Sequence, residues 1–139
     1  MGCDIHAVVQ YKTKNGWRNS KLRVFRERSY ALFGFLADVR NYSGIEPLSQ
    51  PRGIPEGFKS GLYSRWKCDW HSESWLSSKE LAAIDFAQIV EDRRHAGKTL
   101  DKGEGKCQTL AEFLGKDNVR DIKKIARLKT GRVVFWFDN

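Results

Sequence analysis

The distribution of proline constrains the fold most, because all three prolines of the chain lie between residues 42 and 67. Proline fixes its own φ and restricts the residue before it, so neither a long helix nor a central strand is expected there. Four glycines in the same segment also favour turns. The segment therefore predicts a long irregular loop. Its stiffest part, Pro51-Arg52-Gly53-Ile54-Pro55, would hold Arg52 in a fixed place.

The residues before this loop predict a β-hairpin and one helix. Alternation over residues 4–11 places Asp4 and His6 on one face of a strand. Asn15-Gly16 is typical of a hairpin turn, and Trp17 opens the returning strand. Residues 22–28 have no clean apolar face and predict a weak strand or a loop. From Ser29 an apolar period of 3.6 indicates a helix that ends near Arg40-Asn41.

The residues after the loop predict three more helices and a final strand. Ser77 to Glu80 and Thr109 to Glu112 both match the capping box that begins a helix. The first of these helices is expected to continue through Val90 and to fray by Gly97, and a third begins near Asp117. Arg132 to Phe137 is β-branched and aromatic, which predicts a strand beside the first one.

These elements predict an α+β fold. A small antiparallel sheet, made of the N-terminal hairpin and the C-terminal strand, would pack with about four helices and the long Pro/Gly loop. The length of 139 residues predicts a single domain, 1–139.

Composition favours an anionic partner and a reducing compartment. The formal net charge is +8, which attracts anions such as nucleotides. The three cysteines, Cys3, Cys68 and Cys107, form no Cys-x-x-Cys pair, so neither a disulfide framework nor a thiolate zinc finger is expected. No apolar run is long enough to cross a membrane. The expected location is the cytoplasm.

One short pattern with chemical potential occurs twice. Cys3-Asp4-Ile5-His6 and Cys68-Asp69-Trp70-His71 share the order Cys-Asp-x-His. On a strand, residues i and i+2 point the same way, so each unit would present a carboxylate beside an imidazole. If the two units converge, they would form either a divalent metal site or a pair of histidines that act as general acid and base. The spacing does not choose between these.

Further residues are candidates for ligand binding, each with an ordinary structural alternative. Ser72 and Ser74 could donate hydrogen bonds to phosphate, or act in capping and turns. Trp70 could stack on a base, although tryptophan is more often part of the core. Arg52, Arg40 and Asn41 could hold an anion from the loop and the helix end, although arginine is most often solvated or paired.

Several blocks of the sequence also resemble a family of small, largely uncharacterised proteins that phages and prophages encode. The blocks are Gly2-Cys3-Asp4-Ile5-His6, Leu32-Phe33 with Leu36-Ala37-Asp38-Val39-Arg40-Asn41, Pro51-Arg52-Gly53-Ile54-Pro55, His71-Ser72-Glu73-Ser74-Trp75-Leu76 and Val134-Phe135-Trp136-Phe137-Asp138-Asn139. The resemblance implies work inside an infected bacterial cell, where small phage proteins often counter host defences, including those that use nucleotide signals.

Two functions follow as hypotheses. The first is a nucleotide-directed phosphodiesterase, in which His6 and His71 act as acid and base, Asp4 and Asp69 orient them or bind metal, and Arg52 holds phosphate. The second is a non-catalytic protein that sequesters a nucleotide signal or docks on a host protein.

Overall fold

The computed structural model describes residues 2–64 and 69–139. Within these residues the fold is α+β, as the sequence predicts, with four helices and an antiparallel sheet that contains the N-terminal strands and the C-terminal strand. Contacts along the chain group into two compact units. Unit 1 comprises residues 1–28, 51–84 and 120–139, and unit 2 comprises residues 29–50 and 85–119. The expectation of one domain over residues 1–139 stays a prediction.

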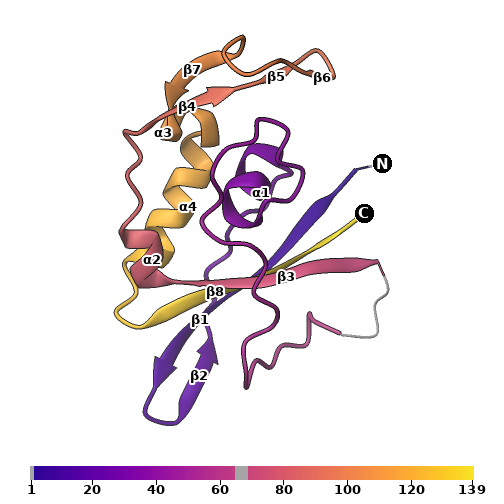
Figure 1. Cartoon of the computed structure of the whole chain (residues 1–139). Coiled ribbons are helices and arrows are strands. Elements are labelled where there is room, and N and C mark those ends of the chain that lie inside the picture. The colour runs from indigo at the N-terminus through magenta and orange to yellow at the C-terminus, as the bar shows by residue number, and fades with distance from the viewer. Residues whose placement is uncertain (1, 65–68) are drawn as a thin grey trace. The chain divides into compact units, whose positions relative to one another are not determined.

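Unit 1 is built on a four-stranded sheet in the order β2-β1-β8-β3 (Figure 1). The strands are β1 (Asp4–Thr13), β2 (Gly16–Asn19), β3 (Trp70–Ser77) and β8 (Gly131–Asp138). All neighbouring pairs are antiparallel, and β8 pairs with β1 from Tyr11↔Gly131 to Asp4↔Asp138. The C-terminal strand therefore lies directly beside the N-terminal strand, as the sequence predicts.

The position of β8 follows from its composition. Five consecutive residues, Val133 to Phe137, are fully buried, which requires cover on both faces of the strand. A continuous β-branched and aromatic run is typical of such a strand, whereas alternation is typical of a half-exposed one. β8 is accordingly an interior strand, with β1 on one side and β3 on the other.

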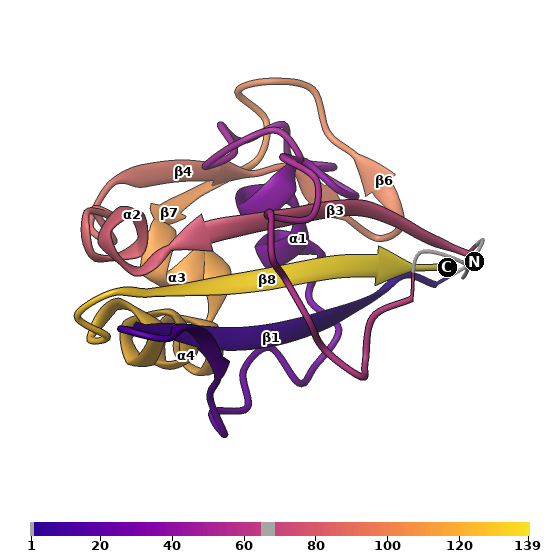
Figure 2. The ribbon, with the colours of Figure 1, turned by 90° about the horizontal axis from the view of Figure 1, so that it is seen from below.

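The part of the proline-containing segment that belongs to unit 1, residues 51–64, runs along this sheet (Figure 2). Residues 42–64 contain no helix or strand, as predicted, and residues 65–67 of the expected loop lie outside the described residues. The N–H group of Gly53 donates to the carbonyl of Glu73 on the outer edge of β3, at 2.8 Å. Farther along, Phe58 and Tyr63 pack against Trp136 of β8. This part of the loop thus packs against strands β3 and β8 of the sheet.

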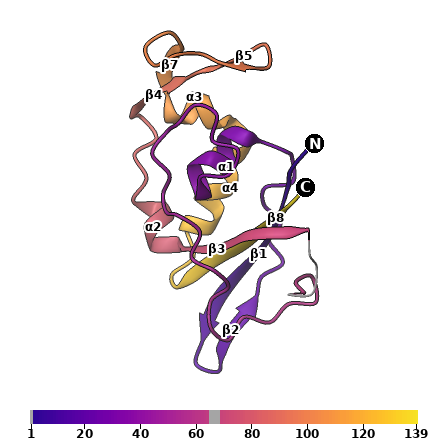
Figure 3. The same ribbon diagram turned by 45° about the vertical axis from the view of Figure 1, so that its right-hand side comes forward.

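Helix α2 (Ser78–Ala82) follows β3 directly (Figure 3) and begins with the predicted capping box between Ser77 and Glu80. The second half of α4 (Lys116–Ala126) also belongs to unit 1. Its buried Asp121 accepts a hydrogen bond from the N–H group of Phe25 at 2.9 Å. This contact holds the segment after β2, which forms no strand and places Phe25 at a φ of 56°.

Unit 2 contains α1 (Tyr30–Ala37), α3 (Leu110–Leu114) and the first residues of α4. Its strands form two antiparallel pairs, β4 (Ile89–Asp92) with β7 (Lys106–Thr109) and β5 (Arg94–His95) with β6 (Lys98–Thr99). Ser29 caps α1 and Thr109 caps α3, both as predicted. The Oγ of Ser43 donates to Asp92 and accepts from the N–H group of Arg93, which ties the loop after α1 to β4.

The prediction that the helix after Ser77 continues through Val90 is wrong. It ends at Ala82, and Ile89–Asp92 is strand β4. The Asp85 carboxylate accepts from the N–H group of Ala87 at 3.0 Å, a local bond that competes with helix formation. The β-branched pair Ile89 and Val90 then finds a strand partner in β7. No helix in the described residues is long and apolar enough to cross a membrane.

Candidate functional site

His6 lies near the start of β1, opposite Trp136 on β8. Its Nε2 forms a hydrogen bond with the carboxylate of Asp138, which is two residues farther along β8 and on the same face of the sheet. The side chains are 40% and 28% exposed, respectively, so the pair is open to solvent. A carboxylate on one ring nitrogen fixes the orientation of an imidazole and leaves the other nitrogen for a ligand.

Aromatic rings surround this imidazole. The His6 ring stacks on Trp136 with 5.8 Å between centroids and lies 5.7 Å from the ring of Trp70. Tyr63 stacks on Trp70 at 5.6 Å. We call His6, Asp138, Trp70, Trp136 and Tyr63 the His6 site. Trp70 is half-buried and borders the exposed imidazole, whereas Trp136 is fully buried beneath the others.

Asp4 lies two residues before His6 and on the same face of β1. Its carboxylate accepts two hydrogen bonds from Arg28, at 2.9 and 3.1 Å. The Arg28 guanidinium holds the pKa of Asp4 below its usual range. A Cβ on Gly2 would lie 2.2 Å from Nη1 of Arg28, so the guanidinium packs directly over the glycine. A carboxylate and a guanidinium therefore border the His6 site.

His71 faces the other way, which corrects the expected shared site. It pairs with Phe137 on β8 and stacks on that ring, whereas His6 stacks on Trp136. Because neighbouring residues of a strand point to opposite faces, the two imidazoles lie on opposite faces of the sheet. They are placed neither for a common metal nor for paired acid and base action. The repeated Asp-x-His pattern suggested that the two units converge, but it did not predict strand β3 or the face on which His71 lies.

A β-bulge lies directly after His71. The register shifts between His71 and Ser74, so Ser72 and Glu73 together oppose Trp136. Ser72 has a φ of 54°, and its hydroxyl forms a hydrogen bond with Nδ1 of His71 at 2.9 Å. Nε2 of His71 contacts Oδ1 of Asn139 at 3.2 Å. The imidazole of His71 is thus held by the side chains of Ser72 and Asn139.

The predicted phosphate ligand Arg52 is engaged within unit 1. Its guanidinium forms a bidentate pair with Glu80, donates to the carbonyl of Trp75 at 3.1 Å and covers the Trp75 ring at 4.9 Å. Ser74 is fully buried and accepts a hydrogen bond from the N–H group of Arg52. The stiff loop does hold Arg52 in place, as predicted, but for a structural contact.

Arg40 and Asn41, the other candidates for holding an anion, belong to unit 2. Arg40 donates to the hydroxyl of Tyr42 and lies over the ring of Tyr30. Asn41 donates to Asp38 and to the carbonyl of Ile45, and it accepts from the Ile45 N–H group. These contacts organise the end of α1, where a Cβ on Gly34 would also meet Asn41 at 2.9 Å.

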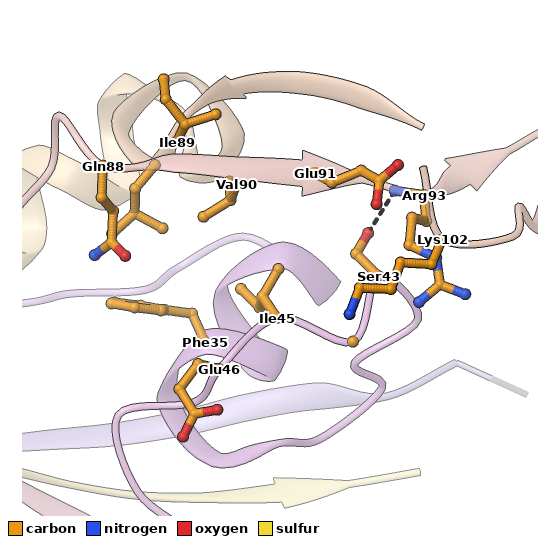
Figure 4. A pocket seen from close by; sticks show the side chains of 12 residues that line it. Phe35, Ser43, Ile45, Glu46, Gln88, Ile89, Val90, Glu91, Arg93 and Lys102 are labelled. Carbon is orange, nitrogen blue, oxygen red and sulfur yellow. Dashed lines mark hydrogen bonds between the residues drawn. The ribbon is translucent and has the colours of Figure 1, made fainter. Parts of the chain in front are cut away.

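Unit 2 contains a concavity of about 280 Å³ that the sequence did not indicate (Figure 4). Phe35, Ile45 and Val90 form its apolar part, and Arg93 and Lys102 lie together at one end. Glu91 is held there by the N–H groups of Gly103 and Gly105, which lower its pKa. With both charge signs at the same end, this concavity selects no ligand class.

The remaining predicted residues are not part of the His6 site. Asp69 is exposed in a turn before β3, and Cys68 lies outside the described residues. Among the described residues, no group of three or more His, Cys, Asp or Glu side chains is arranged to hold a metal ion.

Sequence reasoning missed Asp138, Arg28 and Tyr63. The C-terminal block that contains Asp138 was singled out from the sequence, but the role of Asp138 depends on the register between β1 and β8. The antiparallel register brings Asp138 beside Asp4 and His6, and no spacing within either block encodes it.

Comparisons of this chain with protein family models, with curated proteins and with solved structures found no match.

Proposed function

We propose that the protein binds a nucleotide at the His6 site. The observation that carries the proposal is the open imidazole of His6, held by Asp138 and bordered by the indole of Trp70. A half-exposed indole offers a base a stacking surface. The carboxylates of Asp138 and Asp4 accept hydrogen bonds, which suits ribose hydroxyls or the amino groups of a base.

Two further observations support this function. The indole N–H of Trp136 is buried and has no hydrogen-bond partner in the described chain, so one donor of the His6 site is unsatisfied. The net charge of +8 favours the approach of phosphates. Sequestration of a nucleotide signal of the host defence is the biological role that agrees with the resemblance to phage proteins.

Hydrolysis of a bound phosphodiester is the second candidate function, and the His6–Asp138 pair favours it. A carboxylate that orients an imidazole is the arrangement of a general base. In this version His6 acts without His71, because His71 faces the opposite side of the sheet. His6 would accept the proton of an attacking water or ribose hydroxyl.

The test is calorimetric titration with a panel of linear and cyclic nucleotides, followed by chromatography of the nucleotide after the protein is denatured. We expect at least one nucleotide to bind, and Trp70→Ala to weaken binding by about 1–3 kcal/mol, the usual value of one stacked base. Intact nucleotide in the chromatogram identifies sequestration, and a cleaved product identifies hydrolysis. The proposal is wrong if no nucleotide binds, or if Trp70→Ala binds as well as the wild type.

A further inference from the structure

A second surface of unit 1 is a groove of about 880 Å³ along the edge of β1. β2 pairs with β1 only from Gln10 onward, so the part of β1 from Ile5 to Val9 lacks a strand on that side. The opposite wall is the segment Asn19–Arg26, and Ser60, Gly61 and Leu62 close one end.

The backbone of β1 points into this groove. The carbonyl of Val9 accepts from the N–H group of Ser20 at 2.7 Å, so Val9 aims its backbone groups at this side. In a strand, alternate residues aim their backbone groups the same way, which assigns Ile5 and Ala7 to this side too. Neither residue has a backbone partner there in the described chain. The edge is thus ready to pair with another strand.

The side chains around the groove are cationic and apolar. Lys21, Arg23 and Arg26 are exposed, and none is paired with a carboxylate in the described part of the chain. No Asp or Glu is among the lining residues. Leu22 and Leu62 also line the groove and are 36% and 67% exposed, respectively. A ligand that combines negative charge with apolar side chains fits these walls.

The opposite wall, Asn19–Arg26, is held in place without a ligand. Val24 and Phe25 are buried, and the Phe25 N–H group donates to the carboxylate of Asp121. The Leu22 N–H group donates to the hydroxyl of Ser20 at 3.1 Å. Because this wall is already ordered, a ligand loses little free energy in fixing it.

We propose that this groove binds an acidic peptide in extended conformation, which adds to β1 as a strand. The open edge from Ile5 to Val8 spans about 13 Å at about 3.3 Å per residue, so it accepts about four peptide residues before the bond between Val9 and Ser20. The unpaired backbone groups select a peptide over a nucleic acid, because only a peptide supplies alternating N–H and C=O groups. This surface is independent of the His6 site and gives the protein a protein partner in addition to a nucleotide.

The experiment is fluorescence anisotropy with a labelled eight-residue peptide that alternates glutamate with valine. The comparison peptides have lysine in place of glutamate, or N-methyl groups on alternate amides. We expect only the unmethylated acidic peptide to bind, with affinity that falls as salt rises. The double variant Arg23→Glu/Arg26→Glu should lose at least about tenfold in affinity.

The matched control is Lys79→Glu/Lys129→Glu, which changes the net charge equally at exposed positions outside the groove. It should bind the peptide like the wild type, and circular dichroism should show that both variants fold. Equal affinity for the methylated peptide, or equal weakening by both double variants, would overturn the proposal in favour of nonspecific charge attraction. Displacement of the peptide by an oligonucleotide of the same charge, at equal concentration, would overturn it in favour of nucleic acid.

Discussion

At the scale of single residues, Arg52 and Glu80 show how a cation can be withdrawn from ligand binding. The pair is bidentate, and hydrogen bonding to Arg52 lowers the pKa of Glu80 from 4.5 to about 2. Glu80 also accepts from the N–H group of Ser77 at the start of α2. The side chains are 26% and 38% exposed, so solvent screens the attraction and the stability gain is modest.

Arg52→Ala is therefore expected to lower the free energy of unfolding by about 1 kcal/mol and to leave nucleotide affinity unchanged. Urea denaturation and calorimetric titration measure the two quantities. A loss of affinity without a loss of stability would return Arg52 to the role of a phosphate ligand.

Glu80→Gln separates the charge of Glu80 from its capping contact, because glutamine still accepts the bond from Ser77. The folded-state pKa of Glu80 is depressed, so its charge stabilises the fold above about pH 4.5, and this contribution is lost as the pH falls toward 2. We expect the wild type to be more stable than Glu80→Gln at pH 7 and the difference to vanish near pH 2. A difference that stays constant from pH 7 to pH 2 would contradict this account.

At the scale of elements, local sequence signals predicted where helices begin, whereas tertiary contacts decided where one of them ends. Capping boxes placed the starts of α2 and α3 correctly, because a cap involves only four neighbouring residues. The predicted end of α2 was wrong because Ile89 and Val90 fit a broad helical face as well as a strand. Only the pairing of β4 with β7, whose partners are 14 to 20 residues apart, decides between them.

The loop that joins these strands gives a prediction for Gly105. A Cβ at this position would lie 2.4 Å from the carbonyl oxygen of Asp92. Gly105→Ala should thus destabilise the protein by about 1–3 kcal/mol, because a backbone atom must move. Gly61→Ala is the control, since a Cβ there meets nothing within 4 Å, and it should change stability by less than about 1 kcal/mol. Equal thermal midpoints for the two variants would contradict the close approach at Gly105.

At the scale of the whole molecule, both units are assembled from segments that are distant in sequence. One of the two interior strands of the sheet, β8, comes from residues 131–138. A chain that ends at Thr130 would lack β8, and with it the neighbour that β1 and β3 share. We expect this truncation to lose the cooperative unfolding transition in circular dichroism. A truncated chain that still unfolds cooperatively would show that β1 and β3 do not depend on β8.

The same assembly explains which parts of the candidate site could be predicted. His6 and Trp70 were identified because both lie in a short, chemically dense pattern. Asp138 and Tyr63 were not, because only strand register and the path of the loop bring them to His6. The hypothesis that His71 converges with His6 fails for the same reason, since the pattern gives spacing along the sequence but no relation between strands.

In the proposed function, a nucleotide binds on the face of His6 and not on the face of His71. Calorimetric titration of His6→Ala and His71→Ala with the nucleotide that binds the wild type tests it most directly, because the two variants remove the same side chain from opposite faces of one sheet. We expect His6→Ala to lose at least about tenfold in affinity and His71→Ala to retain wild-type affinity. Equal losses in both variants, or a loss in His71→Ala alone, would contradict the account.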